Sequence, residues 1–396
     1  MLWGYRMTRI AFYSTMAGMP WGGSEELWSR AAGALLEQGH YVSINFKKRK
    51  VLIPPLERLR QLGADLYWRR GLRVGRTLRK LLMRIHIGQN PSIMWLKHAR
   101  PDLLVVSIGY HMDDLSITQT CRSLGVPYAL LLQAASPHQF IEAHSFDRFR
   151  EAWAGAAKCF FVSSQNREVI ETNLALDLSD AQIVDNPFQV SLDARPAWPA
   201  DEKLWKLACV ARVHFLSKAQ DVLLRVLRQP KWRARPIQVS LFGADGGSLR
   251  QLQELITLHS QHKQVVVRGF TPNIEDVWRE HHALVLPSRF EGNALAMIEA
   301  MLCGRVPIVT NVGRVSELVD DDVCGFVAGA ATVELLDDAL ERAWQRRHEW
   351  QAMGQLAAAT IRRRHSLRPA EDFAEQILAA VPARPQTTTG QLRAAA

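Results

Sequence analysis

The fold class is indicated most clearly by residues 283–310, which read Ala283-Leu-Val-Leu-Pro-Ser-Arg-Phe-Glu291-Gly-Asn-Ala-Leu-Ala-Met-Ile-Glu299-Ala-Met-Leu-Cys-Gly304-Arg-Val-Pro-Ile-Val-Thr310. A short apolar run ends at Leu286, and a polar loop follows it. A segment typical of a helix begins near Leu295 and ends before Gly304, a residue that suits a helix terminus. A second apolar run, Val306 to Thr310, comes directly afterwards. This order predicts a strand, a crossover helix and a second strand of a buried parallel sheet.

The same alternation extends along most of the chain in two series. The apolar runs of the first series are 10–14, 41–46, 103–108, 128–132 and 159–162, and those of the second are 207–211, 237–242, 265–267, 283–286 and 306–310. The segments between the runs are long enough to hold crossover helices. The pattern therefore predicts an α/β protein with two domains.

The domain boundary is expected in the polar, proline-containing stretch from Asn186 to Asp201. We expect an N-terminal domain over 7–190 and a C-terminal domain over 191–365. A helix over 366–380 is expected to pack back on the N-terminal domain. The tail 381–396 lacks apolar periodicity, so we expect it to be disordered.

The composition narrows the class of protein. Of the 396 residues, 47% are hydrophobic and 22% are charged, which excludes disorder of the whole chain. No apolar run approaches the roughly 18 residues of a membrane span, and the N-terminal residues lack the apolar core of a secretion signal. The five cysteines are scattered, with no metal-ligand spacing. We therefore expect a cytoplasmic protein with reduced thiols and no metal site.

The positive charge is concentrated in the segment 47–100. This segment holds 15 basic and two acidic residues, a local net charge of +13. Because the whole chain has a net charge of +10, the rest of the chain has a net charge of −3. Basic residues within it recur at helical spacing, while apolar residues gather on another face; the basic set is Arg69, Arg73, Arg76, Lys80 and Arg84. The pattern predicts a basic amphipathic helix.

Three interpretations of this basic segment remain open. A basic amphipathic helix can lie on an anionic membrane surface, where each Lys or Arg contributes about 1 kcal/mol. It can also be a solvated helix of the N-terminal domain. A nucleic-acid-binding role is disfavoured, because the basic residues alternate with Leu and Ile and not with exposed aromatic residues. We expect a peripheral protein of the inner membrane surface and no nucleic-acid partner.

The loop and helix after Leu286 have the features of a ligand site. The backbone N–H groups of Asn293, Ala294 and Leu295 would lie at the positive end of a helix dipole, which suits a diphosphate. Glu299 lies one turn into the helix, where its carboxylate can accept hydrogen bonds from sugar hydroxyls. Glu291 follows the carboxyl end of the strand, where open α/β sheets bind ligands. Alternatively, both Glu residues are capping or solvated carboxylates.

A second candidate cluster follows the first strand of the C-terminal series. Arg212 ends that strand, and Ser217 with Gln220 has the spacing of a capping box that starts a helix. Arg212 and Lys218 thus lie on either side of a strand-to-helix loop. Two converging cations suit a diphosphate leaving group; alternatively, both are solvated surface cations.

These motifs resemble those of glycosyltransferase family 4. Arg212 to Leu224 is similar to the Arg and Lys segment of that family, and Glu291 to Glu299 resembles its paired-Glu motif. The resemblance continues through Gly313 to Val327. In the first half it is looser and rests on the following short motifs: Gly22-Gly23-Ser24-Glu25, Val162-Ser163 and Asn186-Pro187.

The resemblance implies a GT-B architecture, in which two Rossmann-like domains face each other across a cleft. It also implies metal-independent, hexosyltransferase-type transfer of a sugar, with retention of anomeric configuration, from a UDP-, GDP- or ADP-linked donor. The acceptor would be lipid-linked or a polysaccharide, and no cofactor would be needed besides the donor substrate. By the same resemblance, Arg212 and Lys218 hold the donor diphosphate, Glu299 the ribose and Glu291 the donor sugar, and Gly22 and Gly23 form the first glycine loop.

One position departs from the family pattern. The family commonly has a His six residues after a Pro of the N-terminal domain, next to the donor sugar, whereas this chain has Pro127 and then Gln133. Gln133 can form a neutral hydrogen bond but cannot become cationic. Either the sugar contact is neutral here, or His111 or His138 replaces it. Because of this departure, the protein could instead be a non-catalytic relative of the family that binds nucleotide sugar or glycan without turnover.

Overall fold

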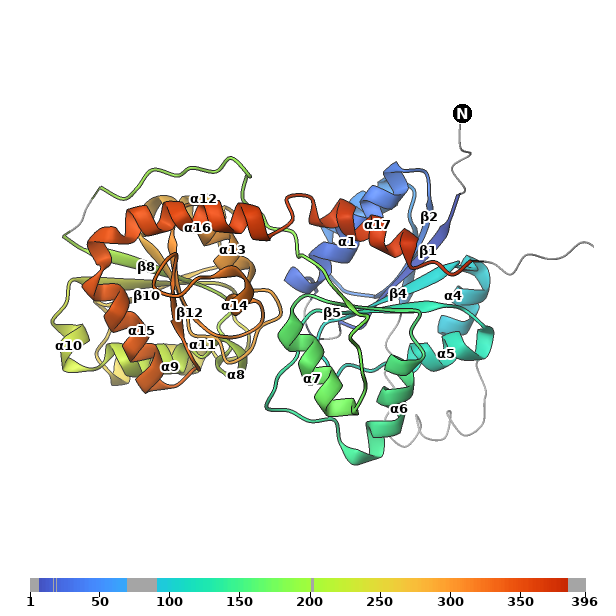
Figure 1. Ribbon diagram of the computed structural model, residues 1–396, viewed down its shortest axis with the longest axis horizontal. Helices are drawn as coiled ribbons and strands as arrows, with labels where there is room; N and C mark the ends of the chain where they lie inside the picture. The colour runs from blue at the N-terminus through green and yellow to red at the C-terminus, as the bar shows by residue number, and fades with distance from the viewer. Residues whose placement is uncertain (1–6, 17, 19, 70–90, 201–202, 384–396) are drawn as a thin grey trace, which may run out of the picture.

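The computed structural model describes residues 7–16, 18, 20–69, 91–200 and 203–383, which form two α/β domains side by side (Figure 1). Each domain is built on one parallel sheet with helices on both faces. The predicted α/β class with two Rossmann-like domains is thereby confirmed. The predicted basic helix lies almost entirely in 70–90, outside the described residues, and the predicted disordered tail lies outside them from residue 384 onward.

The N-terminal sheet has seven parallel strands in the order β3-β2-β1-β4-β5-β6-β7. Its strands are β1 (Arg9–Ser14), β2 (Tyr41–Lys47), β3 (Asp65–Arg69), β4 (Leu103–Ile108), β5 (Tyr128–Leu132), β6 (Lys158–Phe161) and β7 (Gln182–Ile183). The helices are α1 (Gly23–Glu37), α2 (Pro54–Gln61), α4 (Pro91–Ala99), α5 (Ser116–Leu124), α6 (Ala143–Ala154) and α7 (Ser164–Leu174). The strand order reverses direction between β1 and β4, so a crevice opens there at the carboxyl edge of the sheet.

The C-terminal sheet repeats this topology with six parallel strands in the order β10-β9-β8-β11-β12-β13. Its strands are β8 (Trp205–Val210), β9 (Ile237–Phe242), β10 (Val265–Gly269), β11 (Ala283–Leu286), β12 (Val306–Thr310) and β13 (Phe326–Ala328). The helices are α8 (Phe215–Lys218), α9 (Gln220–Leu227), α10 (Pro230–Arg233), α11 (Leu249–Leu258), α12 (Ile274–Glu280), α13 (Leu295–Leu302), α14 (Val315–Leu318), α15 (Val333–Gln345), the 3-10 helix η1 (Arg347–Glu349) and α16 (Trp350–Arg364). The corresponding reversal lies between β8 and β11.

The last helix of the described residues returns to the first domain (Figure 1). α16 covers the C-terminal sheet, and the chain then crosses to α17 (Pro369–Ala379), which packs against α1. Phe373 and Ile377 of α17 belong to the N-terminal core, and the Phe373 ring meets the Phe160 ring edge-on at 5.2 Å. Helix α17 therefore completes the core to which β1 also belongs.

Polar contacts join the two domains at the start of α7. The Glu317 carboxylate accepts hydrogen bonds from the Ser164 backbone N–H at 3.1 Å and hydroxyl at 2.6 Å. The Gly313 N–H donates to Gln165 Oε1 at 2.5 Å. Arg314 forms ion pairs with Glu317 and with Asp185 of the interdomain linker. These contacts hold the two carboxyl edges opposite each other.

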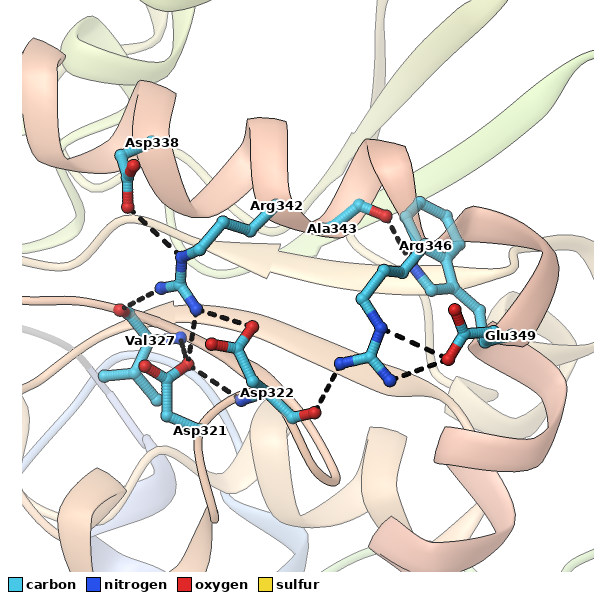
Figure 2. Close-up of polar contacts among 9 residues, drawn as sticks. Asp321, Asp322, Val327, Asp338, Arg342, Ala343, Arg346 and Glu349 are labelled. Atoms are coloured by element: carbon cyan, nitrogen blue, oxygen red, sulfur yellow. Dashed lines mark hydrogen bonds and ion pairs between the residues drawn. The ribbon is translucent and has the colours of Figure 1, made fainter.

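An arginine-centred network fixes the turn before β13 to α15, away from the cleft (Figure 2). Arg342 forms ion pairs with three carboxylates, those of Asp321, Asp322 and Asp338, and donates to the Val327 carbonyl at 2.9 Å. Arg346, one turn later, pairs with Glu349 and donates to the Asp322 carbonyl. The network supports the edge of the second sheet.

The structure corrects two local expectations. Three strands, β3, β7 and β13, were not among the predicted apolar runs. Arg69 ends β3, so the prediction that it belongs to a helical basic face is wrong. Among the described residues, no helix combines the length and the apolar character that crossing a membrane requires.

Candidate functional site

A cavity of about 450 Å³ lies between the carboxyl edges of the two sheets. Its walls come from the loops after β1, β4 and β5 on one side and after β8 and β11 on the other. Of these strands, β1 and β4, and β8 and β11, lie on either side of the two chain reversals, where open α/β sheets bind ligands. Apart from Glu299, His111 and the alternative His138, every residue predicted for the site lines this cavity.

The centre of the C-terminal wall is an ion pair. Lys218 Nζ lies 2.5 Å and 2.6 Å from the two carboxylate oxygens of Glu291, and both side chains are largely buried. The Ser288 hydroxyl donates to Glu291 Oε1 at 2.6 Å. Residues far apart in the sequence thus place one cation and one carboxylate side by side in the cavity wall.

The turn that carries Lys218 is held by the loop after β11. The Arg289 guanidinium forms two hydrogen bonds, of 2.9 Å and 2.8 Å, with the Asp221 carboxylate at the start of α9. The Arg289 backbone N–H donates to the Ser217 carbonyl at 2.8 Å. Both contacts fix α8 against the loop that bears Glu291, so they set the geometry of the ion pair.

The predicted capping box of Ser217 and Gln220 is wrong. Ala219 adopts a left-handed conformation with φ of 51° and separates the short helix α8 from α9. Gln220 Nε2 donates instead to the Arg212 carbonyl at 2.8 Å, and the Ser217 hydroxyl contacts His214 Nδ1 at 2.7 Å. These bonds fix the strand-to-helix loop between the two predicted cations.

The N-terminus of α13 forms the next part of the wall. The N-cap residue Ala294 has no side chain that could accept from the first backbone N–H groups. Asn293, Ala294 and Leu295 all line the cavity, so these donors meet its interior. In the described structure, both polar side-chain atoms of Asn293 are buried and have no hydrogen-bond partner. The wall therefore offers polar groups that a ligand could satisfy.

The N-terminal wall is formed partly by the glycine loop. Gly22 is the N-cap of α1, and Gly23 begins this helix. A Cβ atom added to Gly23 would lie 3.2 Å from the Leu295 side chain of the other domain. The two helix N-termini, of α1 and of α13, therefore approach each other closely across the cavity.

Gly292 lies at a close approach between the domains. A Cβ atom at this position would lie 1.7 Å from the Gln133 carbonyl oxygen and 2.8 Å from a methyl of Val162. Backbone from the second domain thus rests directly on backbone from the first. A larger residue at 292 cannot be accommodated without separating the domains.

Gln133 lines the cavity, and its side chain is partly engaged. Asn186 Nδ2 donates to Gln133 Oε1 at 2.9 Å, whereas Gln133 Nε2 is buried and has no partner in the described structure. His111 does not line the cavity: it is buried, and its Nε2 contacts the Gln139 carbonyl at 3.0 Å. Burial lowers the pKa of His111. The replacement of the family His by His111 is therefore not supported.

Glu299 also lies outside the cavity wall. Its carboxylate accepts a hydrogen bond of 3.0 Å from the Gln189 backbone N–H in the interdomain linker. Burial raises its pKa to about 7. The helix α13 begins and ends as predicted, but the side of the helix that bears Glu299 faces the linker.

Sequence reasoning missed several residues of the wall. Asp113 follows β4 and lines the cavity; it accepts from the Thr15 hydroxyl at 2.6 Å, and burial raises its pKa. Tyr110 and Phe290 line it from opposite domains, with ring centroids 5.7 Å apart. The position of Asp113, in the same loop as His111 after a buried strand, was the one available signal.

Fold and site together define the class of protein. Two Rossmann-like domains whose reversal points face one another across a cavity form a GT-B fold. Residues 205–346, from the first strand of the second domain to the end of α15, match the family model described as glycosyl transferases group 1. The resemblance to glycosyltransferase family 4 is thereby confirmed, and the match lies in the C-terminal domain.

Two curated proteins illustrate the sequence similarity. A D-inositol 3-phosphate glycosyltransferase from Saccharomonospora viridis is 32% identical over 154 residues, which cover 36% of this chain and 35% of that protein. A glycogen synthase from Rhodopseudomonas palustris is 26% identical over 235 residues, 57% of this chain and 46% of that protein. The chain thus matches less than half the length of either relative.

Solved structures agree in fold over nearly the whole chain. Anabaena HepE in complex with UDP and glucose superposes with a TM-score of 0.72 at 14% identity, covering 94% of this chain and 99% of that one. The lipopolysaccharide outer core galactosyltransferase WaaB superposes with a TM-score of 0.69 at 17% identity, covering 93% and 99%. Similarity at this level of identity establishes the shared fold alone.

Proposed function

We propose that the protein is a retaining glycosyltransferase that moves a sugar from a nucleotide-sugar donor to a lipid-linked or polysaccharide acceptor. The observation that carries this proposal is the C-terminal cavity wall, where Arg212, Lys218 and the N-terminus of α13 surround one space. Cations and helix N-termini stabilise a diphosphate leaving group as its negative charge develops. The family match over the same domain supports the assignment.

In this proposal Lys218 has two partners in turn. The structure pairs it with Glu291, and the donor diphosphate would compete for the same ammonium group. Glu291 would then be free to accept a hydrogen bond from a hydroxyl of the donor sugar. Retention would follow the route implied by the family: the acceptor hydroxyl attacks on the face from which the diphosphate leaves, the bond between the sugar and the diphosphate breaks, and the departing phosphate takes the proton of the acceptor.

UDP-sugars are the first donors to test, because neighbours of the same fold are described as complexes with UDP and with UDP-glucose. The test is a thermal-shift panel of UDP-, GDP- and ADP-sugars and their nucleoside diphosphates, followed by product analysis with proton NMR. Stabilisation by one nucleotide series and an α-linked product from an α-linked donor would agree with the proposal. No thermal shift with any of these nucleotides, or a product with inverted anomeric configuration, would contradict it.

A catalytically inactive binder is the second candidate, and Gln133 favours it. This side chain lies where the family commonly has a His, and Asn186 already occupies its carbonyl oxygen. Such a protein would bind nucleotide sugar without transfer. Donor consumption measured over hours with the stabilising nucleotide sugar distinguishes the candidates, because a pure binder leaves the donor intact.

We also propose that the basic segment 47–100 attaches the protein to the anionic inner membrane surface. The support is its local net charge of +13. Salt-sensitive sedimentation with vesicles of anionic phospholipid is expected, and Arg73→Glu combined with Arg76→Glu should reduce it. Sedimentation that is absent at low salt would contradict the proposal.

A further inference from the structure

The loop after β4 places a carboxylate in the N-terminal wall of the cavity. Asp113 lines the cavity, as does Tyr110 of the same loop. The Asp113 backbone N–H donates to the Tyr110 carbonyl at 2.8 Å, and the Tyr110 backbone N–H donates to Asp113 Oδ2 at 3.1 Å. The Thr15 hydroxyl, from the loop after β1, donates to the same oxygen at 2.6 Å. Two loops of the N-terminal domain thus hold this carboxylate in one orientation.

The bonds that fix the Asp113 carboxylate end on Oδ2. Among the residues that the structure describes, no hydrogen bond reaches Oδ1, and no cation pairs with this carboxylate. Burial raises the pKa of Asp113, while the hydrogen bonds from Thr15 and Tyr110 oppose this effect because they stabilise the ionised form. Oδ1 is therefore a hydrogen-bond acceptor that the fold leaves to a ligand of the cavity.

Two aromatic rings complete this part of the wall. The rings of Tyr110 and Phe290 come from opposite domains and line the cavity, with centroids 5.7 Å apart and an interplanar angle of 35°. The Tyr110 hydroxyl donates to Gln139 Oε1, which fixes the ring of Tyr110. The face of an aromatic ring carries negative charge density, so it attracts the weakly positive C–H groups of a sugar ring. A carboxylate beside such rings suits a sugar, whose hydroxyls and C–H groups lie on one small frame.

The two walls of the cavity differ in charge. Among the described residues that line it, the cations are Arg212 and Lys218, and both belong to the C-terminal domain. The N-terminal wall contributes the Asp113 carboxylate and no cation among these lining residues. A negatively charged ligand group is therefore attracted to the C-terminal wall and repelled from the N-terminal wall.

We propose that Asp113, Tyr110 and Phe290 form a subsite that selects an acceptor whose reacting unit is an uncharged sugar ring. The inference rests on the proposed function, because it assigns the N-terminal wall of the same cavity to the acceptor. Asp113 Oδ1 accepts a hydrogen bond from a hydroxyl of the ring, and the two aromatic rings pack against its C–H groups. A phosphorylated sugar is rejected, because its charge would lie beside the carboxylate.

The test measures the binding of sugar probes while the nucleotide site is occupied. The protein is saturated with the nucleoside diphosphate that stabilises it best, and the methyl α-glycosides of glucose, galactose, mannose and N-acetylglucosamine are screened by saturation-transfer NMR. The glycoside that binds most tightly and its 6-phosphate are then titrated. We expect the neutral glycoside to bind about ten-fold or more tightly than the 6-phosphate. If none of the four glycosides binds, or if the 6-phosphate binds more tightly, the proposal fails.

Asp113→Asn separates sugar recognition from the support of the loop. The change keeps an oxygen for the bonds from Thr15 and Tyr110 and removes the negative charge. It should weaken binding of the neutral glycoside about ten-fold and weaken the 6-phosphate less, so that the preference narrows. Asp114→Asn is the matched control, because Asp114 is exposed and is not part of the cavity lining; it should change neither affinity. Equal weakening of both probes by Asp113→Asn would mean that the carboxylate only stabilises the loop.

Phe290→Leu tests the aromatic part of the subsite independently. It should weaken the neutral glycoside about three-fold or more, whereas Phe140→Leu should not, because the Phe140 ring is 64% exposed and is not part of the cavity lining. Wild-type affinity in Phe290→Leu would contradict the proposed subsite.

Two further measurements separate this subsite from the donor site. If Asp113→Asn weakens the nucleotide sugar as much as the glycoside, the carboxylate serves the donor, and the proposal is wrong. Thermal-shift binding of the nucleoside diphosphates, measured first, reports separately on the proposed function. If none of them binds, that function fails, and titration of the glycosides into the free protein still decides whether Asp113 selects an uncharged sugar.

Discussion

The pairing of Lys218 with Glu291 is the residue-scale feature on which the proposed function most depends. Both groups lie in the cavity wall, 2.5 Å apart at their closest atoms. Lys218→Ala removes the cation that would bind the diphosphate and leaves the Glu291 carboxylate with the Ser288 hydroxyl but without its cationic partner. We expect transfer to fall by about 100-fold or more and nucleoside diphosphate binding to weaken, as measured by initial rates and calorimetry.

Lys263→Ala is the matched control for this variant. Lys263 is exposed in the same domain, before β10, at the edge of the sheet away from the cavity. It loses the same side chain and should retain wild-type rates. Wild-type turnover by Lys218→Ala would remove this residue from the assigned machinery.

Glu25 makes a pH-dependent contribution to stability. Burial, partly offset by hydrogen bonds from Ser14 and Trp28, raises its pKa from 4.5 to about 7. The folded protein therefore binds more protons than the unfolded chain between these values, so the free energy of unfolding falls as pH rises through this window. Glu25→Gln cannot ionise and can still accept from Trp28 Nε1.

We therefore expect Glu25→Gln to lose less thermal stability than the wild type between pH 5 and pH 8. The measurement is the Tm at both values in matched buffers. Glu37→Gln, at an exposed position of the same helix, should follow the wild type. If Glu25→Gln and the wild type lose the same stability, the buried carboxyl is ionised in the folded protein throughout this range.

Residue types at fixed spacing predicted the cavity-lining residues well in the loops that follow strands. Arg212, Lys218 and Glu291 could be selected because parallel strands bring their carboxyl ends to one edge. Side-chain direction within a helix or loop could not be selected in this way. Glu299 bonds to the linker and His111 is buried behind the wall, while Asp113 reaches the cavity from the same loop as His111.

At the scale of elements, the loop between β11 and α13 sets the approach of the domains. Gly292 carries no Cβ atom, and the Gln133 carbonyl occupies the place where one would be. Gly292→Ala should force the domains apart and lower transfer by about ten-fold or more, while each domain stays folded. Small-angle scattering should show a larger radius of gyration.

Gly329→Ala is the control for this substitution, because an added Cβ would meet its nearest neighbour at 3.8 Å, an ordinary contact. It should change neither the radius of gyration nor the rate. If Gly292→Ala is as compact and as active as the wild type, the tight contact between the domains is not required for function.

Helix α17 packs into the N-terminal core, so we expect it to stabilise the N-terminal domain. Phe373 is 1% exposed and packs on Phe160. Phe373→Ala should destabilise this domain by about 3 to 5 kcal/mol, the usual loss for a buried Phe. Chemical denaturation followed by hydrogen exchange should locate the loss in the N-terminal sheet.

Leu367→Ala serves as the comparison, since Leu367 is 45% exposed just before α17. It should cost less than about 1 kcal/mol. Equal losses for the two variants would mean that α17 is not part of the N-terminal core in solution.

Elements with long apolar runs were predictable, and short or mixed ones were not. β3 contains Asp65 and ends at Arg69, and β7 has only two residues, so neither shows a continuous apolar run. The capping-box spacing at Ser217 failed because Ala219 takes a left-handed conformation and divides the helix. Backbone conformation at a single residue is set by the packed loop and is not visible in the spacing.

At the scale of the whole molecule, the arrangement separates two kinds of positive charge. Arg212 and Lys218 line the cavity and belong to the part of the chain outside the basic segment, whose net charge is −3. The excess of positive charge lies in the basic segment. Among the described residues of this segment, Lys47, Arg49 and Arg69 lie at or near the carboxyl edge of the N-terminal sheet. The +10 of the chain is thus concentrated in one segment of the sequence and is not spread evenly along it.

The domain pairing itself could be predicted only in outline. Two series of apolar runs indicated two sheets, but the contacts that orient them are single residues such as Glu317 on Ser164 and Gly292 on Gln133. Each contact joins positions more than a hundred residues apart, and no local pattern marks it. The facing of the two carboxyl edges therefore rested on the family resemblance until the structure placed them.

The most direct test of the central claim is hydrogen exchange with and without the stabilising nucleotide sugar. A donor held between the domains should protect backbone amides on both sides, at 212–218 and 291–297 in the second domain and at 22–24 in the first. Lys218→Ala should lose this protection. Protection confined to regions away from the cavity, or no protection at saturating nucleotide sugar, would contradict the account.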